Sequence, residues 1–81
     1  MSESAKANAM ERIGRIWAET LGVETVQPQD NFFGLGGDSI LVTIMTMQVE
    51  EALDRLVSAD LVFDAPTLEA FTEALLAEAA A

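Results

Sequence analysis

The residues with the clearest chemical potential in this chain are Gly36, Gly37, Asp38 and Ser39. Two glycines allow a backbone with positive φ or a close approach to another molecule. They precede a serine hydroxyl at the expected start of a helix, where free N–H groups and the helix dipole favour an anion. Ser39 is therefore placed to carry a phosphate ester. The same residues are also compatible with a plain turn followed by a helix N-cap.

Three other kinds of site do not fit this segment. A P-loop requires Lys immediately before the Ser or Thr, where this chain has Asp38. A nucleophile elbow requires Gly-x-Ser-x-Gly, whereas Leu41 stands two residues after Ser39. An EF-hand needs more oxygen ligands than Asp30, Asn31 and Asp38 supply. Ser39 is thus not expected to act as a catalyst.

Composition removes most catalytic and metal-binding chemistry from consideration. The chain has no His and no Cys, which excludes the usual zinc ligands, a disulfide and a Ser-His-Asp or Cys-His centre. Fourteen acidic residues against four basic ones give a net charge of −10. That charge repels phosphate backbones and disfavours a nucleic-acid partner. Hydrophobic residues make up 51% of the chain, which is enough for a folded core.

Length and hydropathy indicate one domain without a membrane segment. The 81 residues fit a single small domain over 1–81, with an ordered core expected at about 6–77. The most apolar stretch, 40–49, is too short to span a bilayer and includes Thr43, Thr46 and Gln48. The N-terminus is polar and has no apolar segment of the signal-peptide type. We therefore expect a cytoplasmic protein with no membrane partner.

Hydrophobic periodicity predicts a first helix and then a long loop. The helix runs from about Lys6 to Leu21, and Gly22 closes it. Four apolar residues of this helix share one arc: Met10, Ile13, Trp17 and Leu21. From Val23 to Asp38 no period persists, and long loops in small domains are usually functional or anchored. The expected anchors of this loop are its large apolar residues Phe32, Phe33 and Leu35.

The second helix should begin at Asp38 or Ser39, both good N-cap residues, and end near Leu53 or Arg55. Its expected core face consists of Leu41, Met45, Val49, Ala52 and Leu56, flanked by Val42 and Leu53. The opposite face is apolar near the start, with Ile40, Ile44 and Met47, and acidic near the end, with Glu50, Glu51 and Asp54. The N-terminal half of the helix is therefore apolar nearly all round. One side of it must stay exposed or meet a partner.

The C-terminal third completes an all-helical pattern. Ser58 can cap a short helical turn through Phe63, and Pro66 then breaks the chain. Thr67 can cap a last helix, which frays over 77–81. The apolar arc of that helix comprises Leu68, Phe71 and Leu75. The predicted fold class is all-α: a small four-helix bundle of three main helices and one short helix, with a long first loop.

The segment 30–40, Asp-Asn-Phe-Phe-Gly-Leu-Gly-Gly-Asp-Ser-Ile, strongly resembles the signature of peptidyl carrier proteins. These are the thiolation domains of nonribosomal peptide synthetases, within the wider acyl carrier family. The resemblance extends over most of the chain. Ile16-Trp17 and Leu21-Gly22-Val23 resemble the end of the family's first helix, and the segment 63–68 resembles the start of its last helix.

The resemblance implies a single carrier (thiolation) domain that is not an enzyme. Its matching serine, Ser39, would be modified with 4'-phosphopantetheine from coenzyme A, and the arm would hold an aminoacyl or peptidyl group as a thioester. A chain without Cys must borrow its thiol from such a group carrier. Gly36, Gly37, Asp38 and Ile40 would be read by the phosphopantetheinyl transferase, with Asp38 helping that enzyme to hold Mg²⁺. Further implied partners are an adenylating enzyme and condensation or tailoring enzymes, and we expect a monomer.

The subclass rests on the residues that follow the serine. Fatty-acid and polyketide carriers usually have acids there, whereas 40–44 is apolar and no acid follows until Glu50, which favours the peptidyl type. A fatty-acid or polyketide acyl carrier and an unmodified helical interaction domain are the alternatives. The family often has Arg in the second half of this helix and Gly near its end; this chain has Glu50, Glu51 and Asp54 instead. A start at Met1 leads us to expect a free-standing carrier.

A docking surface is expected beside the serine. Ile40, Ile44 and Met47 lie on the face of the second helix opposite its core face, and Phe63 joins them as a candidate partner contact. Clustered apolar groups near an attachment point favour a docking patch. The alternative is that the short helix or the long loop covers them.

Overall fold

The first helix provides one wall of the core. In the computed structural model, which describes residues 3–80, α1 spans Glu3–Leu21, so it starts three residues before the predicted Lys6. The ammonium of Lys6 contacts the carboxylates of Glu69 and Glu73, which holds the first turn of α1 against the C-terminal helix. At the other end, Gly22 adopts φ +72°, the left-handed conformation expected of a helix-terminating glycine.

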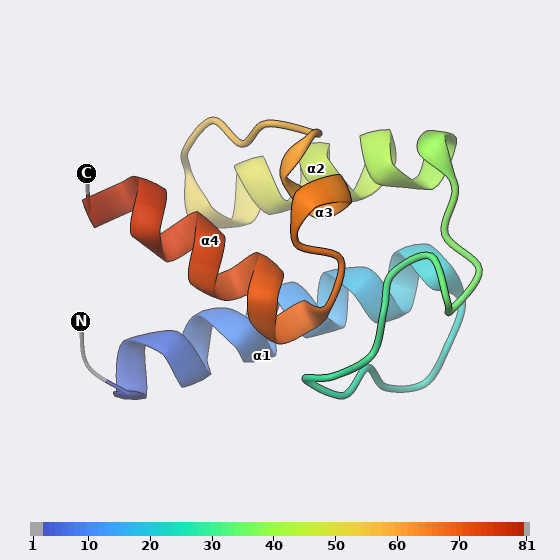
Figure 1. Cartoon of the computed structure of the whole chain (residues 1–81), viewed down its shortest axis with the longest axis horizontal. Helices are drawn as coiled ribbons and strands as arrows, with labels where there is room; N and C mark the ends of the chain where they lie inside the picture. The colour runs from blue at the N-terminus through green and yellow to red at the C-terminus, as the bar shows by residue number, and fades with distance from the viewer. Residues whose placement is uncertain (1–2, 81) are drawn as a thin grey trace.

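Three further helices follow, and the prediction of an all-α four-helix bundle is confirmed. They are α2 (Ser39–Leu53), α3 (Leu61–Asp64) and α4 (Leu68–Ala80). α1 packs against both α2 and α4, and the short α3 packs against α4 (Figure 1). The expectation of one domain over 1–81 also includes residues 1, 2 and 81, which lie outside the described residues.

The core is built around aromatic rings from three parts of the chain. Trp17 of α1 is fully buried; its ring meets Phe32 edge-on at 5.0 Å between centroids and lies 5.5 Å from Phe71 of α4. Edge-to-face contacts of this kind add to the stabilisation from apolar burial. Phe32 is thus the anchor of the long loop that the sequence predicted. Phe33 packs against the core only in part, and Leu35 is half-buried.

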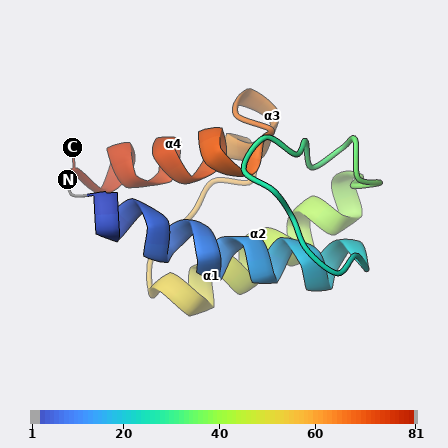
Figure 2. The same cartoon turned by 90° about the horizontal axis from the view of Figure 1, so that it is seen from below.

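The long loop is attached to the start of α4 by backbone hydrogen bonds. The N–H of Phe32 donates to the carbonyl of Pro66 at 2.8 Å, and the N–H of Leu68 donates to the carbonyl of Asp30 at 3.1 Å. Figure 2 shows the loop gathered at the end of the bundle where α2 begins, while α1 begins and α4 ends at the opposite end. The loop that leads into the start of α2 is therefore held by hydrogen bonds to the start of α4.

The inner face of α2 differs from the prediction. Its buried residues are Val42, Met45, Thr46 and Val49. Leu41 and Ala52, expected in the core, are only half-buried. The assignment of Leu56 to the core was wrong: it is 87% exposed, because α2 ends at Leu53 and the periodicity no longer applies three residues later.

The remaining helix boundaries agree more closely with those predicted from the sequence. The short helix begins at Leu61 rather than at Ser58, whose hydroxyl instead accepts a hydrogen bond from the N–H of Asp60 at 3.2 Å. Thr67 caps α4 as predicted, since its hydroxyl accepts from the N–H of Ala70 at 3.2 Å. No helix within residues 3–80 is long and apolar enough to cross a membrane.

Candidate functional site

The two glycines before Ser39 are required for different structural reasons. Gly36 adopts φ +104°, which residues with a Cβ rarely accept. Gly37 is required for space: a Cβ there would overlap the Phe32 ring and lie 2.7 Å from the Phe32 carbonyl oxygen. Its N–H donates to that same carbonyl at 3.0 Å. The close approach made by Gly37 is therefore to the chain's own anchor residue.

Asp38 caps α2, and Ser39 is the first helical residue. The backbone of Asp38 is extended, with φ −137°, and its Oδ1 accepts a hydrogen bond from the N–H of Leu41 at 2.9 Å. Ser39 is exposed. Its carbonyl accepts from the Thr43 hydroxyl at 3.1 Å, whereas its own hydroxyl has no hydrogen-bond partner among residues 3–80. A side-chain hydroxyl free in this way is available to an enzyme that approaches from solvent.

The first turn of α2 fits an attached phosphodiester. Within the part of the chain that the structure describes, the N–H groups of Ser39 and Ile40 have no hydrogen-bond partner, because Asp38 caps only Leu41. Free N–H groups at a helix N-terminus favour an anion placed beside them. Residues 3–80 contain no group of three or more acidic side chains arranged for a metal ion.

Apolar side chains follow Ser39 along the outer face of α2. Ile40 is 70% exposed, Ile44 40% and Met47 58%, and Phe63 of α3 is 53% exposed. The alternative in which the short helix or the long loop covers Ile40, Ile44 and Met47 is therefore wrong. We call these four residues the outer patch: Ile40, Ile44, Met47 and Phe63.

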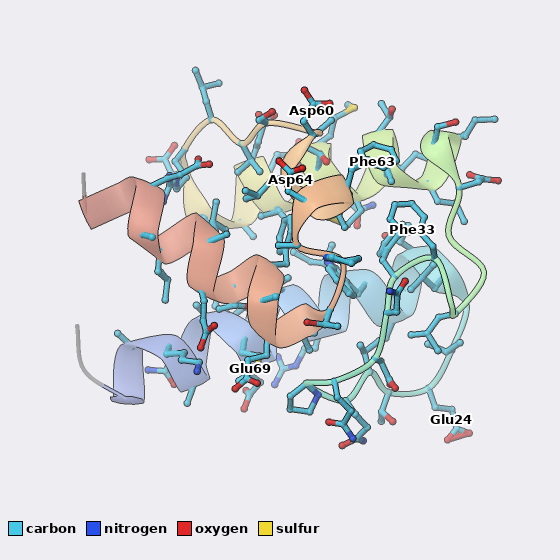
Figure 3. The ribbon with its side chains drawn as sticks, viewed as in Figure 1. Glu24, Phe33, Asp60, Phe63, Asp64 and Glu69 are labelled. Carbon is cyan, nitrogen blue, oxygen red and sulfur yellow. The ribbon has the colours of Figure 1, made fainter. Side chains whose placement is uncertain are left out.

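Phe33 of the long loop packs against one member of the outer patch. Its ring stacks on Phe63, with 5.2 Å between centroids and 24° between the ring planes. Figure 3 shows Phe33 reaching from the long loop toward Phe63 on α3. Sequence reasoning treated Phe33 only as a loop anchor and missed this pairing, because the contact depends on how α3 packs and has no local signal. Sequence reasoning also missed that Leu56 is exposed, because α2 ends at Leu53 and the helical periodicity does not reach Leu56.

The acidic end of α2 has partly structural roles. One Glu50 carboxylate oxygen accepts a hydrogen bond from the N–H of Val57 at 2.8 Å. Asp54 terminates the helix with φ 53°, a left-handed conformation that Asp tolerates better than most residues. Asp54 thus ends α2 in a conformation that glycine adopts more readily than any other residue. The side chains of Glu51 and Asp54 have no partner among residues 3–80.

All four basic side chains are occupied by contacts within the chain. Lys6 contacts Glu69 and Glu73, and hydrogen bonds from Glu73 and then Glu69 hold its pKa above the ordinary value of 10.5. Arg15 pairs with Glu11. The remaining two bases donate to backbone carbonyls, Arg12 to Ala52 and Arg55 to Leu75. Among residues 3–80, none of these four bases forms an ion pair with a carboxylate of α2 or α3.

Comparison with known proteins agrees with this geometry. Residues 11–75 match the family described as the phosphopantetheine attachment site. The chain is 42% identical over 65 residues to a component of the linear gramicidin synthase of Brevibacillus parabrevis, a match that covers 80% of this chain and 1% of that protein. It is 40% identical over 58 residues to the chondramide synthase of Chondromyces crocatus, which covers 72% of this chain and 2% of that protein. The chain thus spans only a small part of the length of these curated relatives.

Solved structures share the fold over most of the chain. BlmI, a type-II acyl carrier protein from Streptomyces verticillus involved in bleomycin biosynthesis, superposes with a TM-score of 0.89 at 33% identity over 93% of this chain and 90% of that one. A peptidyl carrier protein solved with the phosphopantetheine transferase Sfp and coenzyme A gives 0.79 at 25% identity, over 85% and 90%. The McyG A-PCP structure complexed with phenylalanyl-adenylate gives 0.77 at 31% identity, over 93% and 11%.

The family match covers most of the chain, and the fold, the glycine turn and the exposed serine all agree with it. The chain therefore belongs to the phosphopantetheine attachment family, and it resembles carriers of the peptidyl type.

Proposed function

We propose that Ser39 is the attachment residue and that the chain carries an aminoacyl or peptidyl group for nonribosomal peptide synthesis. The observation that carries this proposal is the exposed, unpartnered Ser39 hydroxyl at the N-terminus of α2. The attached 4'-phosphopantetheine supplies the thiol that this Cys-free chain lacks and holds the cargo as a thioester. The chain's own residues position the serine, stabilise the phosphodiester and provide the docking surface for partner enzymes.

Those residues position the serine and fix its surroundings. Gly37 allows the buried Phe32 ring to pack directly against the turn that leads to the serine. Asp38 begins the helix directly before the serine, and its second carboxylate oxygen is free of partners within residues 3–80 to contribute to a Mg²⁺ ion held by the transferase. The free N–H groups of Ser39 and Ile40 stabilise the negative charge of the phosphodiester once it is attached.

The outer patch is the proposed docking surface for partner enzymes. It starts one residue after Ser39 and extends along α2 to α3, so an enzyme bound there has the attachment point within reach. Exposed apolar groups of this size on a monomeric protein are typical of interaction sites. The high net charge of −10 opposes self-association, which supports a monomer that meets its partners in turn.

The partners follow from the same surface and from the family. A phosphopantetheinyl transferase, with Gly36, Gly37, Asp38 and Ile40 around its target serine, would install the arm. An adenylating enzyme would then load it, and condensation or tailoring enzymes would use the cargo. In support, the solved relatives include a carrier with the transferase Sfp and one in an A-PCP protein. Both free-standing carriers and carrier domains of synthetases share this fold.

The peptidyl subclass is tested by competitive loading. Holo protein is incubated with a panel of amino-acid adenylating enzymes and, separately, with a malonyl transferase, and the acylated product is followed by intact mass. We expect an aminoacyl adduct from at least one adenylating enzyme and little malonyl adduct. The Ser39→Ala variant should give neither product. Preferential malonyl loading would instead support the fatty-acid or polyketide alternative.

A further inference from the structure

Met47 brings a thioether sulfur into the outer patch. It follows Ile44 by three residues on the outer face of α2, and 58% of the residue is exposed. The Met47 side chain also lines a solvent-open hollow of about 460 Å³ at the end of α2. The other residues that line this hollow are Glu50, Glu51, Asp54, Arg55 and Leu56. A molecule as small as hydrogen peroxide can therefore reach Met47 in the folded protein.

The other methionines within residues 3–80 are shielded. Met45, on the inner face of α2, is fully buried, and Met10 of α1 packs in part against the core. A buried side chain is oxidised only after the structure around it opens, whereas an exposed side chain reacts in the folded state. Met45 is therefore a control within the same helix for the reactivity of Met47.

We infer that Met47 is an oxidation site and that its conversion to the sulfoxide weakens docking on the outer patch. This inference rests on the proposed function, since it assigns a form of regulation to the proposed docking surface. A lone pair of the Met47 sulfur attacks one oxygen of hydrogen peroxide, so that an S–O bond forms while the O–O bond breaks. The sulfur is oxidised by two electrons, and the departing oxygen takes the proton of the transferred hydroxyl and leaves as water.

The sulfoxide places a polar group within an apolar surface. Its oxygen accepts hydrogen bonds, but the ionised carboxylates of Glu50 and Glu51 in the same hollow are acceptors too. The guanidinium of Arg55 donates to the carbonyl of Leu75. Water therefore hydrates the sulfoxide, and an apolar partner surface has to remove that water in order to dock. Because the flexible, polarisable Met side chain suits surfaces that meet several partners, we expect the change to affect more than one of them.

Peptide mapping after limited treatment with hydrogen peroxide tests the oxidation site. Folded protein is treated for increasing times, catalase stops the reaction, and the sulfoxide at each methionine is quantified by mass spectrometry. We expect Met47 to oxidise about tenfold or more faster than Met45. The circular dichroism spectrum should be unchanged when Met47 is largely converted. Equal oxidation rates at Met45 and Met47 would overturn the assignment of the site.

The effect on docking is measured as the Kd for a broad-specificity phosphopantetheinyl transferase. All proteins carry Ser39→Ala, so that coenzyme A and Mg²⁺ can be present without transfer. This parent, its Met47→Leu derivative and the matched control derivative Met10→Leu are each titrated before and after peroxide treatment. We expect oxidation to raise the Kd about threefold or more in the parent and in the Met10→Leu derivative, and less than about 1.5-fold in the Met47→Leu derivative. Methionine sulfoxide reductases with a thiol reductant, one for each sulfoxide epimer, should restore the Kd of the parent.

Three results of this titration would overturn the inference: a Kd that oxidation leaves unchanged in the parent, an equal rise in the Met47→Leu derivative, or no binding before oxidation. The attachment of phosphopantetheine is judged separately, from the intact mass of the wild-type chain. An adduct on Ser39 combined with a Kd insensitive to oxidation would therefore count against the role of Met47 and leave the proposed function in place. An oxidation-sensitive Kd without any adduct on the wild-type chain would count against the proposed function alone.

Discussion

The inner and outer faces of α2 are both apolar, yet they have different surroundings. On the inner face Val42, Met45 and Val49 are at most 2% exposed, whereas Ile40 and Met47 on the outer face are 70% and 58% exposed. Both sets come from the same ten-residue stretch, so hydrophobicity alone does not separate them. Contact with α1 separates them, because one helix cannot bury both faces in so small a bundle. The inner face stabilises the fold, and the outer face is free for partners.

The largest expected difference between the two faces comes from placing a charge on each. Val49→Asp puts a carboxylate among fully buried groups, at a cost of about 3–5 kcal/mol. A domain of this length has a total stability of roughly 4–12 kcal/mol, so the variant should melt at a much lower temperature than wild type, and at the lower end of that range it should lose its cooperative thermal transition. Met47→Asp should keep its helicity and its transition within about 0.5 kcal/mol of wild type, as surface substitutions usually do.

Circular dichroism with thermal melting measures both variants. If Met47→Asp unfolded as Val49→Asp does, the outer face would be a second core and its docking role would be wrong.

The next effect tests the support beneath the serine. Gly37→Ala forces a Cβ against the Phe32 ring and carbonyl, and overpacking of this kind typically costs about 1–3 kcal/mol. Gly34→Ala is the matched control, since its Cβ would meet Asn31 at an ordinary 3.4 Å. Denaturant unfolding should show a clear loss for Gly37→Ala and a smaller one for Gly34→Ala. Equal losses would mean that the contact with Phe32 does not constrain the turn.

A smaller effect is expected on the rate of phosphopantetheine transfer to Ser39. Ile44→Asp and Met47→Asp should slow phosphopantetheine transfer by a broad-specificity transferase several-fold, equivalent to about 1 kcal/mol, because they place a charge in the proposed docking surface. Glu19→Gln, on the exposed side of α1, is the control and should leave the rate unchanged. Initial rates of phosphopantetheine transfer, measured by mass spectrometry, compare the two aspartate variants with this control. Unchanged rates in both aspartate variants would argue against docking on α2.

The smallest effect concerns the unpaired acids. With 14 acidic and four basic residues, repulsion between carboxylates should lower stability when it is not screened. Raising the ionic strength from about 0.01 M to about 0.15 M shortens the Debye length from about 30 Å to about 8 Å and should raise Tm by a few degrees. Differential scanning calorimetry at the two salt concentrations tests this. A Tm independent of salt would show that the few bases already compensate the acids.

Elements with strong local signals could be predicted from the sequence. The periodicity of α1, the cap residue Asp38 and the Thr67 cap before α4 each depend on residues within a few positions of one another. The segment 30–40 carries the family resemblance in the same local way. The exposed outer face of α2 could also be predicted, because a helix apolar nearly all round in a small domain must leave one side uncovered.

Features that depend on contacts distant in sequence could not be predicted. Leu56 follows the α2 periodicity but lies outside the helix, since Asp54 adopts a left-handed conformation that ends it early. The stacking of Phe33 on Phe63 joins residues from the long loop and the short helix, which lie far apart in the sequence. The role of Gly37 depends on where Phe32 packs, and Phe32 is placed by Trp17 of another helix.

The most direct test of the central claim is the site of modification. Wild type and Ser39→Ala are incubated with coenzyme A, Mg²⁺ and a broad-specificity transferase, and intact mass is followed by fragment mapping. We predict one phosphopantetheine per wild-type chain, located on Ser39, and none on Ser39→Ala, which should stay folded because Asp38 rather than Ser39 supplies the cap. An adduct on Ser39→Ala, or on Thr43 or Ser58 of the wild type, would contradict the assignment, as would an unmodified wild-type chain.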